Sequence, residues 1–348
     1  MLTRAALRYV AKELEKDAAK KMNMSSCSVK DLSSNTASGG RRKKMARRKR
    51  NIRIEALPER YRSKVLQRWN APTSSRDTSY SSSSTSITPD AWVRTMSSSI
   101  RSFFLPIVSQ IVTHNAAAAL LGDKRVHLLT TEQVRRLMTF ASSDGEASHP
   151  QRWRAGSILD IGAGSGDVTR EFRSIFDEVV AVEVSAACRW RLARDGFADR
   201  VESSLDVFEK HHRTFDVVAM LNVLDRCDDP KNLLLRAKRR LLMRGHDTNA
   251  RGGKMLVAVA YPWNPFSIEG GDVARARPQS HTSDDVTSTL RRASSFESFV
   301  AAICEHLFEE NGLGVDAISR VPYTCKGARP LDCAIFVLRK KTAGGGET

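Results

Sequence analysis

The sequence predicts an α/β domain with a mostly parallel β-sheet, and two observations lead to this fold class. From residue 157 onward, short apolar segments alternate with amphipathic segments of helical period, which is typical of βαβ units. The first apolar segment, 157–161, runs directly into Gly162, Gly164 and Gly166. Because only glycine lets the backbone approach a ligand closely, this strand, turn and helix start together indicate a nucleotide-cofactor site.

The predicted sheet has seven strands. Parallel strands are expected at 157–161, 179–184, 200–204, 215–221 and 254–260, and an antiparallel pair at the edge is expected at 315–321 and 334–339. Helices are expected at 167–176, 186–195, 230–242 and 295–311, where Pro230 opens the third and Gly312 closes the fourth. A further helix begins after the capping box of Thr130 and Gln133. Residues 264–292 break the rhythm, which predicts either an insertion or mobile lid over the site, or a flexible loop.

Composition divides the chain into three parts. Residues 1–91 are predicted to be a largely disordered extension, with short helices at 1–22 and 57–69 and a Ser/Thr-rich linker at 72–89. Residues 92–340 are predicted to form the folded domain, which begins with an apolar helical cap that ends near Gly122. Residues 341–348 are predicted to be a disordered tail. A domain of roughly 250 residues can bury a core without disulfides.

Positive charge is concentrated in one run. The formal net charge is +17, and nine positive side chains lie between Arg41 and Arg53. Such a run favours binding to nucleic acid or to an import receptor. A solvated tail without a dedicated partner is the alternative.

Cysteine spacing and hydropathy bear on the compartment. The six cysteines are scattered, with no Cys-x-x-Cys pair and no metal-site spacing, so free thiols, a reduced compartment and no metal are expected. No segment has the ~20 apolar residues of a membrane-spanning helix, and no secretory signal is expected at the start. A soluble intracellular protein of the nucleus or cytoplasm is therefore favoured. The basic, amphipathic start Met1–Lys12 also resembles a mitochondrial presequence, so the mitochondrion stays an alternative.

Acidic residues around the glycine turn indicate which cofactor binds. A dinucleotide site would place a third glycine at position 167, where this chain has Asp, so NAD is disfavoured. Asp160, two residues before the turn, is typical of the S-adenosyl-L-methionine (SAM) motif of Rossmann-like methyltransferases. Glu183, at the end of the second strand, is predicted to accept both ribose hydroxyls. Asp206, after the third strand, is a candidate acceptor for the adenine amino group, with an ordinary loop acid as the alternative.

A second group of polar side chains follows the fourth predicted strand. Asn222 and Asp225 lie where enzymes of this kind place groups that face the substrate. Asp225 is not expected to cap the helix at Pro230, because Asp228 and Asp229 lie closer to it. The sequence therefore predicts that both side chains face the substrate.

Five blocks of the sequence resemble the DREV-type methyltransferases, over residues from about 95 to 340. They are Leu159–Thr169, Glu183–Ser185, Asn222–Asp228, Tyr261–Phe266 and Arg320–Gly327. The blocks Asn-x-x-Asp-Arg-Cys and Arg-x-Pro-Tyr-x-Cys are more specific than the glycine motif, which many unrelated methyltransferases share. The resemblance implies the class I SAM-dependent methyltransferase fold. It also implies methyl transfer from SAM to Nδ1, the histidine ring nitrogen nearer the backbone, in His-x-His sequences of a protein or peptide.

Three residues are the candidates for this chemistry. An imidazole is mostly neutral at pH 7 and is a good nucleophile, so the enzyme has to select which nitrogen faces the methyl group. Asp225 is expected to accept the hydrogen of the far nitrogen, which fixes the tautomer and stabilises the developing imidazolium. Asn222 is expected to orient the ring or the peptide, and Tyr323 to close the pocket.

Two other function classes stay open. A methyltransferase that acts on RNA or on a small-molecule nucleophile would fit the basic run and the range of substrates that this fold serves. A nucleic-acid amino methylase would carry an Asn/Asp-Pro-Pro-aromatic tetrad after the fourth strand, and this chain has Asn222-Val223-Leu224-Asp225 there. A non-catalytic binding module is disfavoured, because Asp160, the glycines and Glu183 are all present.

Overall fold

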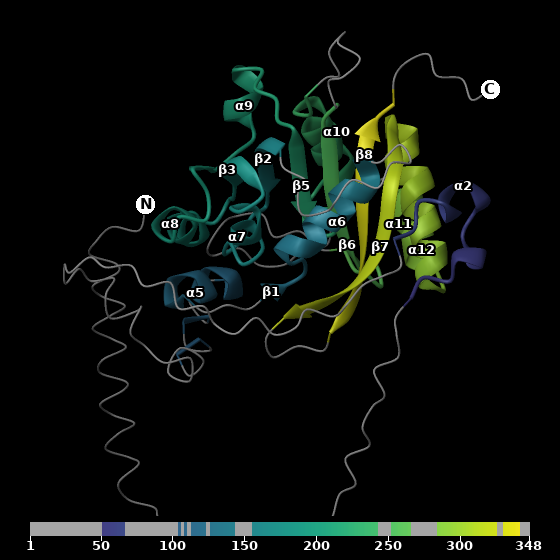
Figure 1. Cartoon of the computed structure of the whole chain (residues 1–348). Helices are drawn as coiled ribbons and strands as arrows, with labels where there is room; N and C mark the ends of the chain where they lie inside the picture. Colours follow the sequence, from purple (N-terminus) through teal and green to yellow (C-terminus); the bar gives the residue numbers. More distant parts are fainter. Residues whose placement is uncertain are drawn as a thin grey trace, which may run out of the picture. The chain divides into compact units, whose positions relative to one another are not determined.

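The computed structural model of the protein (Figure 1) describes residues 51–66, 104–105, 108–109, 113–122, 126–142, 155–242, 252–265, 284–325 and 330–341. All of these residues belong to one unit of the chain, Arg50–Thr348. The helix predicted at 1–22, the linker at 72–89, the basic run before Asn51 and the tail from Thr342 lie outside the described residues.

An eight-stranded sheet forms the centre of this unit, in the order β1-β7-β8-β6-β5-β2-β3-β4. Strands β2 to β6 pair in parallel, whereas β8 is inserted antiparallel between β6 and β7. The predicted mostly parallel sheet with an antiparallel pair near its edge is therefore confirmed. The predicted count of seven strands was one too low, because the two-residue strand β1 pairs with the end of β7. The strands are β1 (Val126–His127), β2 (Ala155–Ile161), β3 (Phe176–Val182), β4 (Arg200–Glu202), β5 (Val217–Leu221), β6 (Lys254–Tyr261), β7 (Leu313–Cys325) and β8 (Leu331–Lys340).

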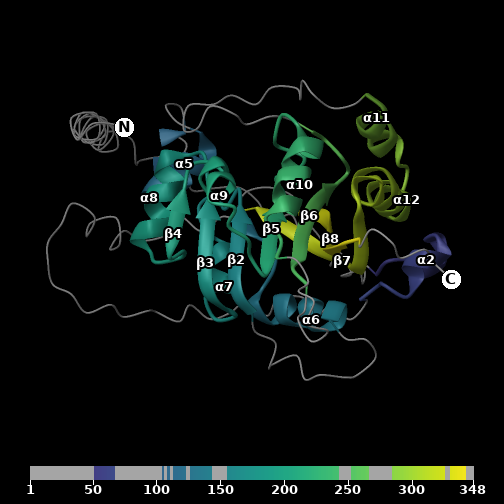
Figure 2. The ribbon, with the colours of Figure 1, turned by 90° about the horizontal axis from the view of Figure 1, so that it is seen from above.

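Helices cover both faces of this sheet. One apolar core lies under α6, α7 and α8 and includes Phe172 and Leu192, and the other lies under α9 to α12 and includes Phe208 and Phe299. Figure 2 shows α6 on one side of the sheet and α10 and α12 on the other. Within the described part of the chain, no helix has the length and apolar composition needed to cross a membrane. The helices are α5 (His114–Leu121), α6 (Thr131–Ser142), α7 (Thr169–Phe172), α8 (Ala186–Arg194), α9 (Asp206–Lys210), α10 (Pro230–Arg239), α11 (Asp284–Arg292) and α12 (Phe296–Ala302).

The helix predicted at 167–176 is much shorter in the structure. Only α7 is helical there, because the chain has already entered β3 at Phe176. The ring of Phe176 packs edge-on against Phe172, with ring centroids 5.9 Å apart. These two buried rings are thus in contact where the chain passes from α7 into β3.

The helix predicted at 295–311 is present but irregular. It consists of α12, a π-helical turn at Ile303–Phe308 and a 3-10 turn at Glu309–Asn311. Gly312 follows with a φ of 68° and closes the run, as predicted. The capping box of Thr130 and Gln133 is likewise confirmed, by two reciprocal hydrogen bonds of 2.8 and 3.3 Å.

Part of the segment that breaks the sequence rhythm, 264–292, is helical. Residues Asp284–Arg292 form α11, whose Leu290 is buried while Val286, one turn earlier, packs against the same core. The alternative of a loop is therefore wrong for this part, the alternative of an insertion or lid stays a prediction, and residues 266–283 lie outside the described residues.

Residues 51–66 pack on the domain, although composition placed them in the disordered extension. Three of their side chains are buried in the core that also contains residues of α12. Val65 then forms a parallel bridge with Ile318 of β7. The helix predicted at 57–69 is limited to α2 (Glu59–Arg62), because the chain leaves the helix to pair with the sheet. The three buried side chains are those of Ile52, Leu57 and Tyr61.

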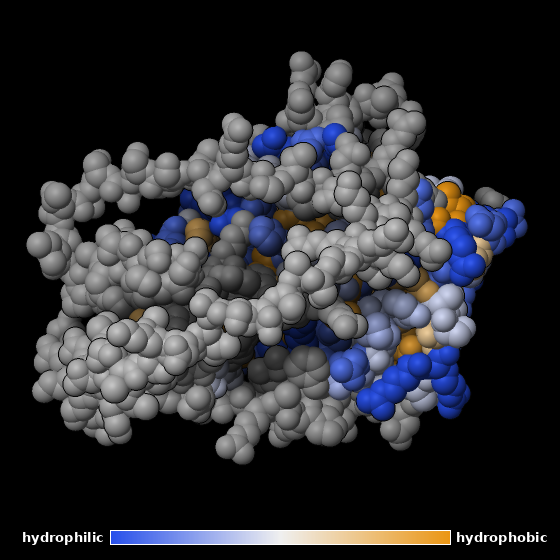
Figure 3. Space-filling view, turned by 90° about the horizontal axis from the view of Figure 1, so that it is seen from below, coloured by the Kyte–Doolittle hydropathy of each residue, from blue (hydrophilic) through white to orange (hydrophobic). Residues whose placement is uncertain are grey.

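Polar contacts also attach this N-terminal segment. Arg53, the last residue of the basic run, donates to Glu297 from its backbone nitrogen at 3.0 Å and from its guanidinium at 3.2 Å. The hydroxyl of Tyr61 donates to Glu309 at 2.8 Å. Figure 3 shows hydrophilic side chains with hydrophobic ones between them at the end of the molecule that carries α2. Arg53 therefore belongs to the fold and not to a solvated tail.

Candidate active site

The glycine turn after β2 packs against protein on one side and is open on the other. Gly162 and Gly164 have φ angles of 73° and 56°, which favour glycine. A Cβ on Gly162 would lie 2.5 Å from Cγ2 of Val223, so the turn closely approaches the loop after β5. A Cβ on Gly164 would meet no atom of the described residues within 4 Å. Gly164 thus borders open space at the carboxyl end of the sheet, where α/β proteins bind ligands.

Glu183, the predicted ribose acceptor, is fixed beside this turn. One carboxylate oxygen accepts a hydrogen bond from the Gly164 backbone nitrogen and the other from that of Ser185, both at 2.8 Å. Burial raises the pKa of Glu183, while these backbone donors act against that rise. A carboxylate has about four lone-pair sites, so each oxygen keeps capacity for a further donor such as a hydroxyl.

Asp160 lies beneath the turn. Its carboxylate accepts a hydrogen bond of 2.7 Å from the Thr169 hydroxyl, which connects β2 to the first residue of α7. Burial raises the pKa of Asp160 to about 7, and the nearby charge of Glu183 raises it further. In the structure, Asp160 therefore supports the turn from inside.

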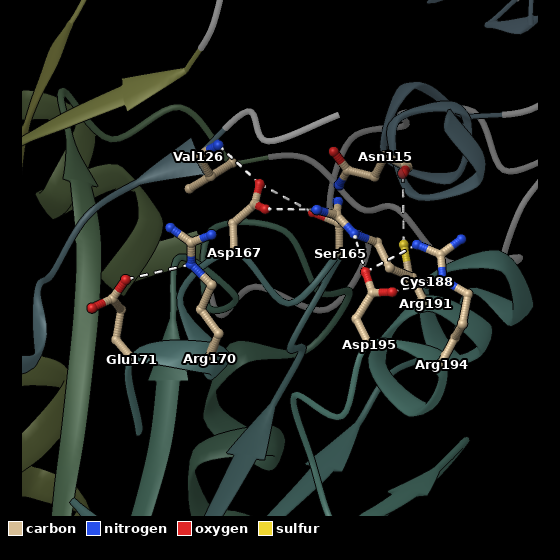
Figure 4. Close-up of polar contacts among 10 residues, drawn as sticks. All are labelled: Asn115, Val126, Ser165, Asp167, Arg170, Glu171, Cys188, Arg191, Arg194 and Asp195. Atoms are coloured by element: carbon tan, nitrogen blue, oxygen red, sulfur yellow. Dashed lines mark hydrogen bonds and ion pairs between the residues drawn. The ribbon is translucent and has the colours of Figure 1, made fainter. Parts of the chain in front are cut away.

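Asp167 joins three segments at the same place, as Figure 4 shows. Its carboxylate accepts hydrogen bonds from the backbone nitrogen of Val126 in β1 at 3.1 Å and from the Ser165 hydroxyl at 3.3 Å. Arg191 of α8 adds a buried ion pair at 3.3 Å. The sequence used Asp167 only to disfavour NAD and missed this role, because the partners are remote in the chain.

Asp206 makes its contacts away from the turn. It begins α9, its side chain is 62% exposed, and it forms an ion pair of 2.6 Å with Arg236 of α10. Arg236 is also shared with Glu209. The structure does not join Asp206 to the other candidate cofactor residues, and its ion pair favours the alternative of an ordinary surface acid.

Asn222 and Asp225 are both buried at the carboxyl end of β5. Asn222 has a φ of 56°, its backbone nitrogen donates to Ala258 of β6 at 2.9 Å, and its side-chain oxygen accepts from the Cys333 thiol at 3.3 Å. Asp229, not Asp225, caps α10, by accepting from the Asn232 backbone nitrogen at 2.9 Å. Asp225 is therefore available for another role, as the sequence predicted.

The carboxylate of Asp225 has one unsatisfied oxygen. Its Oδ2 lies 3.8 Å from Nε of Arg226, but its Oδ1 is buried and has no hydrogen-bond partner among the described residues. Burial raises the pKa of Asp225, and the charge of Arg226 opposes that rise. A buried acceptor without a partner costs ~1–3 kcal/mol, which a ligand N–H would recover.

Tyr323, near the end of β7, belongs to the same cluster. Nη2 of Arg226 donates to its hydroxyl at 3.2 Å, and the guanidinium carbon lies 5.7 Å from the centre of its ring. The structure thus brings together Asn222, Asp225 and Tyr323, which lie in two separate blocks of the sequence.

Two members of this cluster were missed by the sequence reasoning. Arg226 stands in the block Asn222–Asp228, and its position next to Asp225 was an available signal. The sequence did not indicate a role for Cys333, because a single cysteine in a buried apolar strand such as β8 resembles an ordinary core residue. Burial raises the pKa of the Cys333 thiol well above its ordinary value, so it donates to Asn222 as a neutral group.

The sheet order and the glycine turn after β2 define the class I fold of SAM-dependent methyltransferases. The chain belongs to the DREV methyltransferase family, whose model matches residues 54–340. A protein named "Methyltransferase" from Claviceps purpurea (strain 20.1) is 33% identical to this chain over 98 residues. That similarity covers 27% of this chain and 30% of the relative.

Solved structures of similar architecture show low sequence identity. A TehB-like SAM-dependent methyltransferase from Corynebacterium glutamicum is 15% identical, with coverage of 70% of this chain and 100% of that chain and a TM-score of 0.35. DhpI, in complex with SAH, is 17% identical, with coverage of 72% and 94% and a TM-score of 0.34. Similarities at this level carry no functional argument.

The residues at the glycine turn fit the cofactor that this fold and family imply, which is SAM. Gly164 borders open space that a side chain would fill, and Glu183 retains acceptor capacity beside it. SAM combines a nucleoside, which needs acceptors for its ribose hydroxyls, with a sulfonium amino acid that needs close backbone approach. Both requirements are met next to the Asp225 cluster, which follows the neighbouring strand β5.

Proposed function

We propose that this DREV methyltransferase transfers the methyl group of SAM to Nδ1 of histidine in His-x-His sequences of a protein substrate. The observation that carries the proposal is the buried Oδ1 of Asp225, which has no hydrogen-bond partner among the described residues. An imidazole N–H is a donor of the right kind for this acceptor. The family resemblance supports both the His-x-His preference and the choice of Nδ1, and the buried Oδ1 of Asp225 supports an acceptor for a ring N–H.

The cofactor-binding residues of the proposal are Asp160, Gly162, Gly164, Gly166 and Glu183. Bound SAM would supply an electrophilic methyl group on a sulfonium sulfur. The glycine turn would allow the backbone to approach it, and Glu183 would accept the ribose hydroxyls while Gly164 and Ser185 hold its carboxylate in place. Asp160 would act from beneath, through Thr169.

Asp225 would select the reacting nitrogen. By accepting the N–H of Nε2, it would hold the tautomer in which Nδ1 carries the lone pair. Nδ1 would then be the nucleophile toward the methyl group that SAM supplies, and the ring would become a methylated imidazolium. The carboxylate of Asp225 would stabilise that positive charge, and the Nε2 proton would afterwards pass to solvent. No strong base is required, because the neutral ring is already nucleophilic.

Asn222 and Tyr323 would position the substrate. Asn222 is held by Cys333 and by the backbone of Ala258, so its amide is fixed in direction. Tyr323 is held by Arg226 and offers a ring face for stacking on an imidazole. Orientation of this kind increases the rate, because the entropy of aligning the reacting groups is already lost when the substrate binds.

The second candidate function is methylation of RNA or of a small-molecule nucleophile. The observation that favours it is the run of positive charge between Arg41 and Arg53, which suits a polyanion. Arg53 itself forms an ion pair with Glu297, although its side chain stays 64% exposed.

One experiment separates these candidates. The full-length protein is incubated with tritiated SAM and a cell lysate, with and without nuclease, and the protein fraction is hydrolysed for amino-acid analysis. We expect tritium in methylhistidine that resists nuclease. Label that disappears with nuclease, or label in another amino acid, would contradict the proposal.

A further inference from the structure

The guanidinium of Arg226 lies between two candidate catalytic residues from different strands. Its Nε is 3.8 Å from Asp225 Oδ2, and its Nη2 is 3.2 Å from the Tyr323 hydroxyl. Asp225 follows β5, whereas Tyr323 lies on β7, so Arg226 connects side chains that are 98 positions apart in the sequence. The proposed reaction gives no role to this arginine.

We propose that Arg226 is a positioning residue that keeps Asp225 ionised and holds Tyr323 over the substrate position. The proposal rests on the proposed function, because it deepens the role of the same site. Arg226 has no part in bond making, and acts through its two neighbours.

The first step of the argument concerns charge. Asp225 is buried, and a desolvated carboxylate becomes protonated unless a cation or hydrogen bonds stabilise it. Tyr323 and Cys333 face the pair from β7 and β8, and neither carries positive charge. Asp332, the next acid on β8, is paired with Arg320 at 2.6 Å. Among the described residues, Arg226 is the cation whose charge lowers the pKa of Asp225.

This charge decides whether Asp225 can do its work. An ionised carboxylate is an acceptor at both oxygens, whereas a protonated one carries a donor O–H. A protonated Asp225 would offer that donor to an imidazole and favour the opposite tautomer. The proposed selection of Nδ1 therefore requires the ionised form at the working pH.

The second step concerns Tyr323. The arginine contacts this tyrosine in two ways, by the hydrogen bond to its hydroxyl and by the guanidinium 5.7 Å from its ring centre. Tyr323 is only 7% exposed, so a shift of its ring would change the shape of an enclosed site. A lysine in place of Arg226 keeps the charge but cannot make the forked contact to both partners.

The test uses Arg226→Met and Arg226→Lys in the full-length protein with SAH bound. The protonation midpoint of Asp225 is followed by NMR of ¹³C-labelled Asp carboxyl groups, with Asp225→Asn to assign the signal. We expect Arg226→Met to raise the midpoint by ~1–3 pH units and Arg226→Lys to change it little. Unchanged SAH affinity in both variants verifies that the fold is intact. Arg226→Gln replaces the methionine variant if the latter does not fold.

The second readout is turnover on a peptide with alternating histidines. The acid limb of the kcat profile should move upward with Arg226→Met, with kcat falling about tenfold for each unit by which the Asp225 midpoint exceeds the assay pH. Arg226→Lys should leave the acid limb at the wild-type pH and raise KM. Adding Tyr323→Phe to Arg226→Lys should raise KM no further. An Asp225 midpoint that is the same in wild type and Arg226→Met would overturn this inference. A wild-type protein that does not methylate the peptide would instead overturn the proposed function, and the titration would still report on Arg226.

Discussion

The two halves of the candidate site differ in how their buried polar groups are satisfied. In the cofactor half, which comprises the glycine turn and Glu183, every buried acid has partners inside the protein: Asp160 has Thr169, and Glu183 has two backbone N–H groups. In the substrate half, which comprises Asn222 to Arg226 and Tyr323, Asp225 Oδ1 has no partner among the described residues. The indole nitrogen of Trp263, just after β6, has none there either.

The cofactor half is therefore complete before a ligand binds, whereas the substrate half is not. The cofactor half is held in shape by bonds between strands β2 and β3 and the start of α7. The substrate half holds a desolvated acceptor, whose cost of ~1–3 kcal/mol is recovered only when a donor arrives. A site of the second kind discriminates strongly in favour of a substrate that supplies that donor.

The largest expected effect breaks the cofactor half alone. Gly164→Arg should abolish binding of SAH, because the side chain would fill the open space beside the turn. Calorimetric titration with SAH measures the loss. Gly196→Arg is a matched control: its φ of 65° is similar, and a Cβ there also meets no atom within 4 Å in the part of the chain that the structure describes. Equal SAH affinity in wild type and Gly164→Arg would show that the cofactor does not lie at this turn.

The next effect breaks the substrate half alone. Asp225→Asn should lower kcat on a peptide with alternating histidines by ~10²–10⁴, since the charge that stabilises the imidazolium is lost. SAH affinity should stay unchanged, because the cofactor half keeps its contacts. Asp229→Asn is the control in the same loop, since asparagine also caps helices well. If SAH affinity fell along with kcat, the two halves would not be separable.

A third region should affect stability without touching either half. A chain that begins at Trp92 loses the burial of Ile52, Leu57 and Tyr61, at ~1.5–3 kcal/mol for each, and leaves Glu297 without Arg53. We expect a large drop in the free energy of unfolding by urea titration. A chain that begins at Arg50 should match the full-length protein. Equal stability of the Trp92 and Arg50 chains would show that the segment contributes nothing to the fold.

The last prediction concerns the pH dependence of stability in the cofactor half. The pKa of folded Asp160, about 7, lies above its ordinary value of 3.8, so the folded protein binds more protons than the unfolded chain between these values. Its contribution to stability therefore falls as the pH rises from about 4 to about 7, by up to ~1.4 kcal/mol per pH unit.

Asp160→Asn removes this titration and can still accept from Thr169. Thermal unfolding of both proteins at pH 5 and at pH 7.5 makes the comparison. The difference in melting temperature, variant minus wild type, should be larger at pH 7.5 than at pH 5. Parallel pH dependence of the two would contradict an elevated pKa for Asp160.

Local signals in the sequence were sufficient to predict the glycine turn after β2 and the mostly parallel character of the sheet. The run from β2 through Gly162 to α7 is contiguous, so its pattern is complete within about fifteen residues. Asn222, Asp225 and Tyr323 could be named because two short blocks resemble the family. Their meeting in space, and the arginine that joins them, depend on the insertion of β8 between β6 and β7.

Long-range contacts account for what the sequence missed. Residues 51–66 were placed in the extension because their composition is polar, yet their apolar side chains meet α12 some 240 positions later. The helix predicted at 57–69 gave way to pairing of Val65 with β7. Asp206 was assigned from its place after a strand, whereas Arg236 of α10 provides its partner.

The position of the methyl group on the imidazole tests the central claim most directly. A peptide with alternating histidines is methylated by the full-length protein, hydrolysed, and analysed by chromatography that separates the two methylhistidine isomers. If Asp225 Oδ1 holds the N–H of Nε2, all methyl should be on Nδ1, and Asp225→Asn should lower the amount of that isomer by the same factor as kcat. Methyl on Nε2, or methylated RNA with no methylhistidine in protein, would contradict the account.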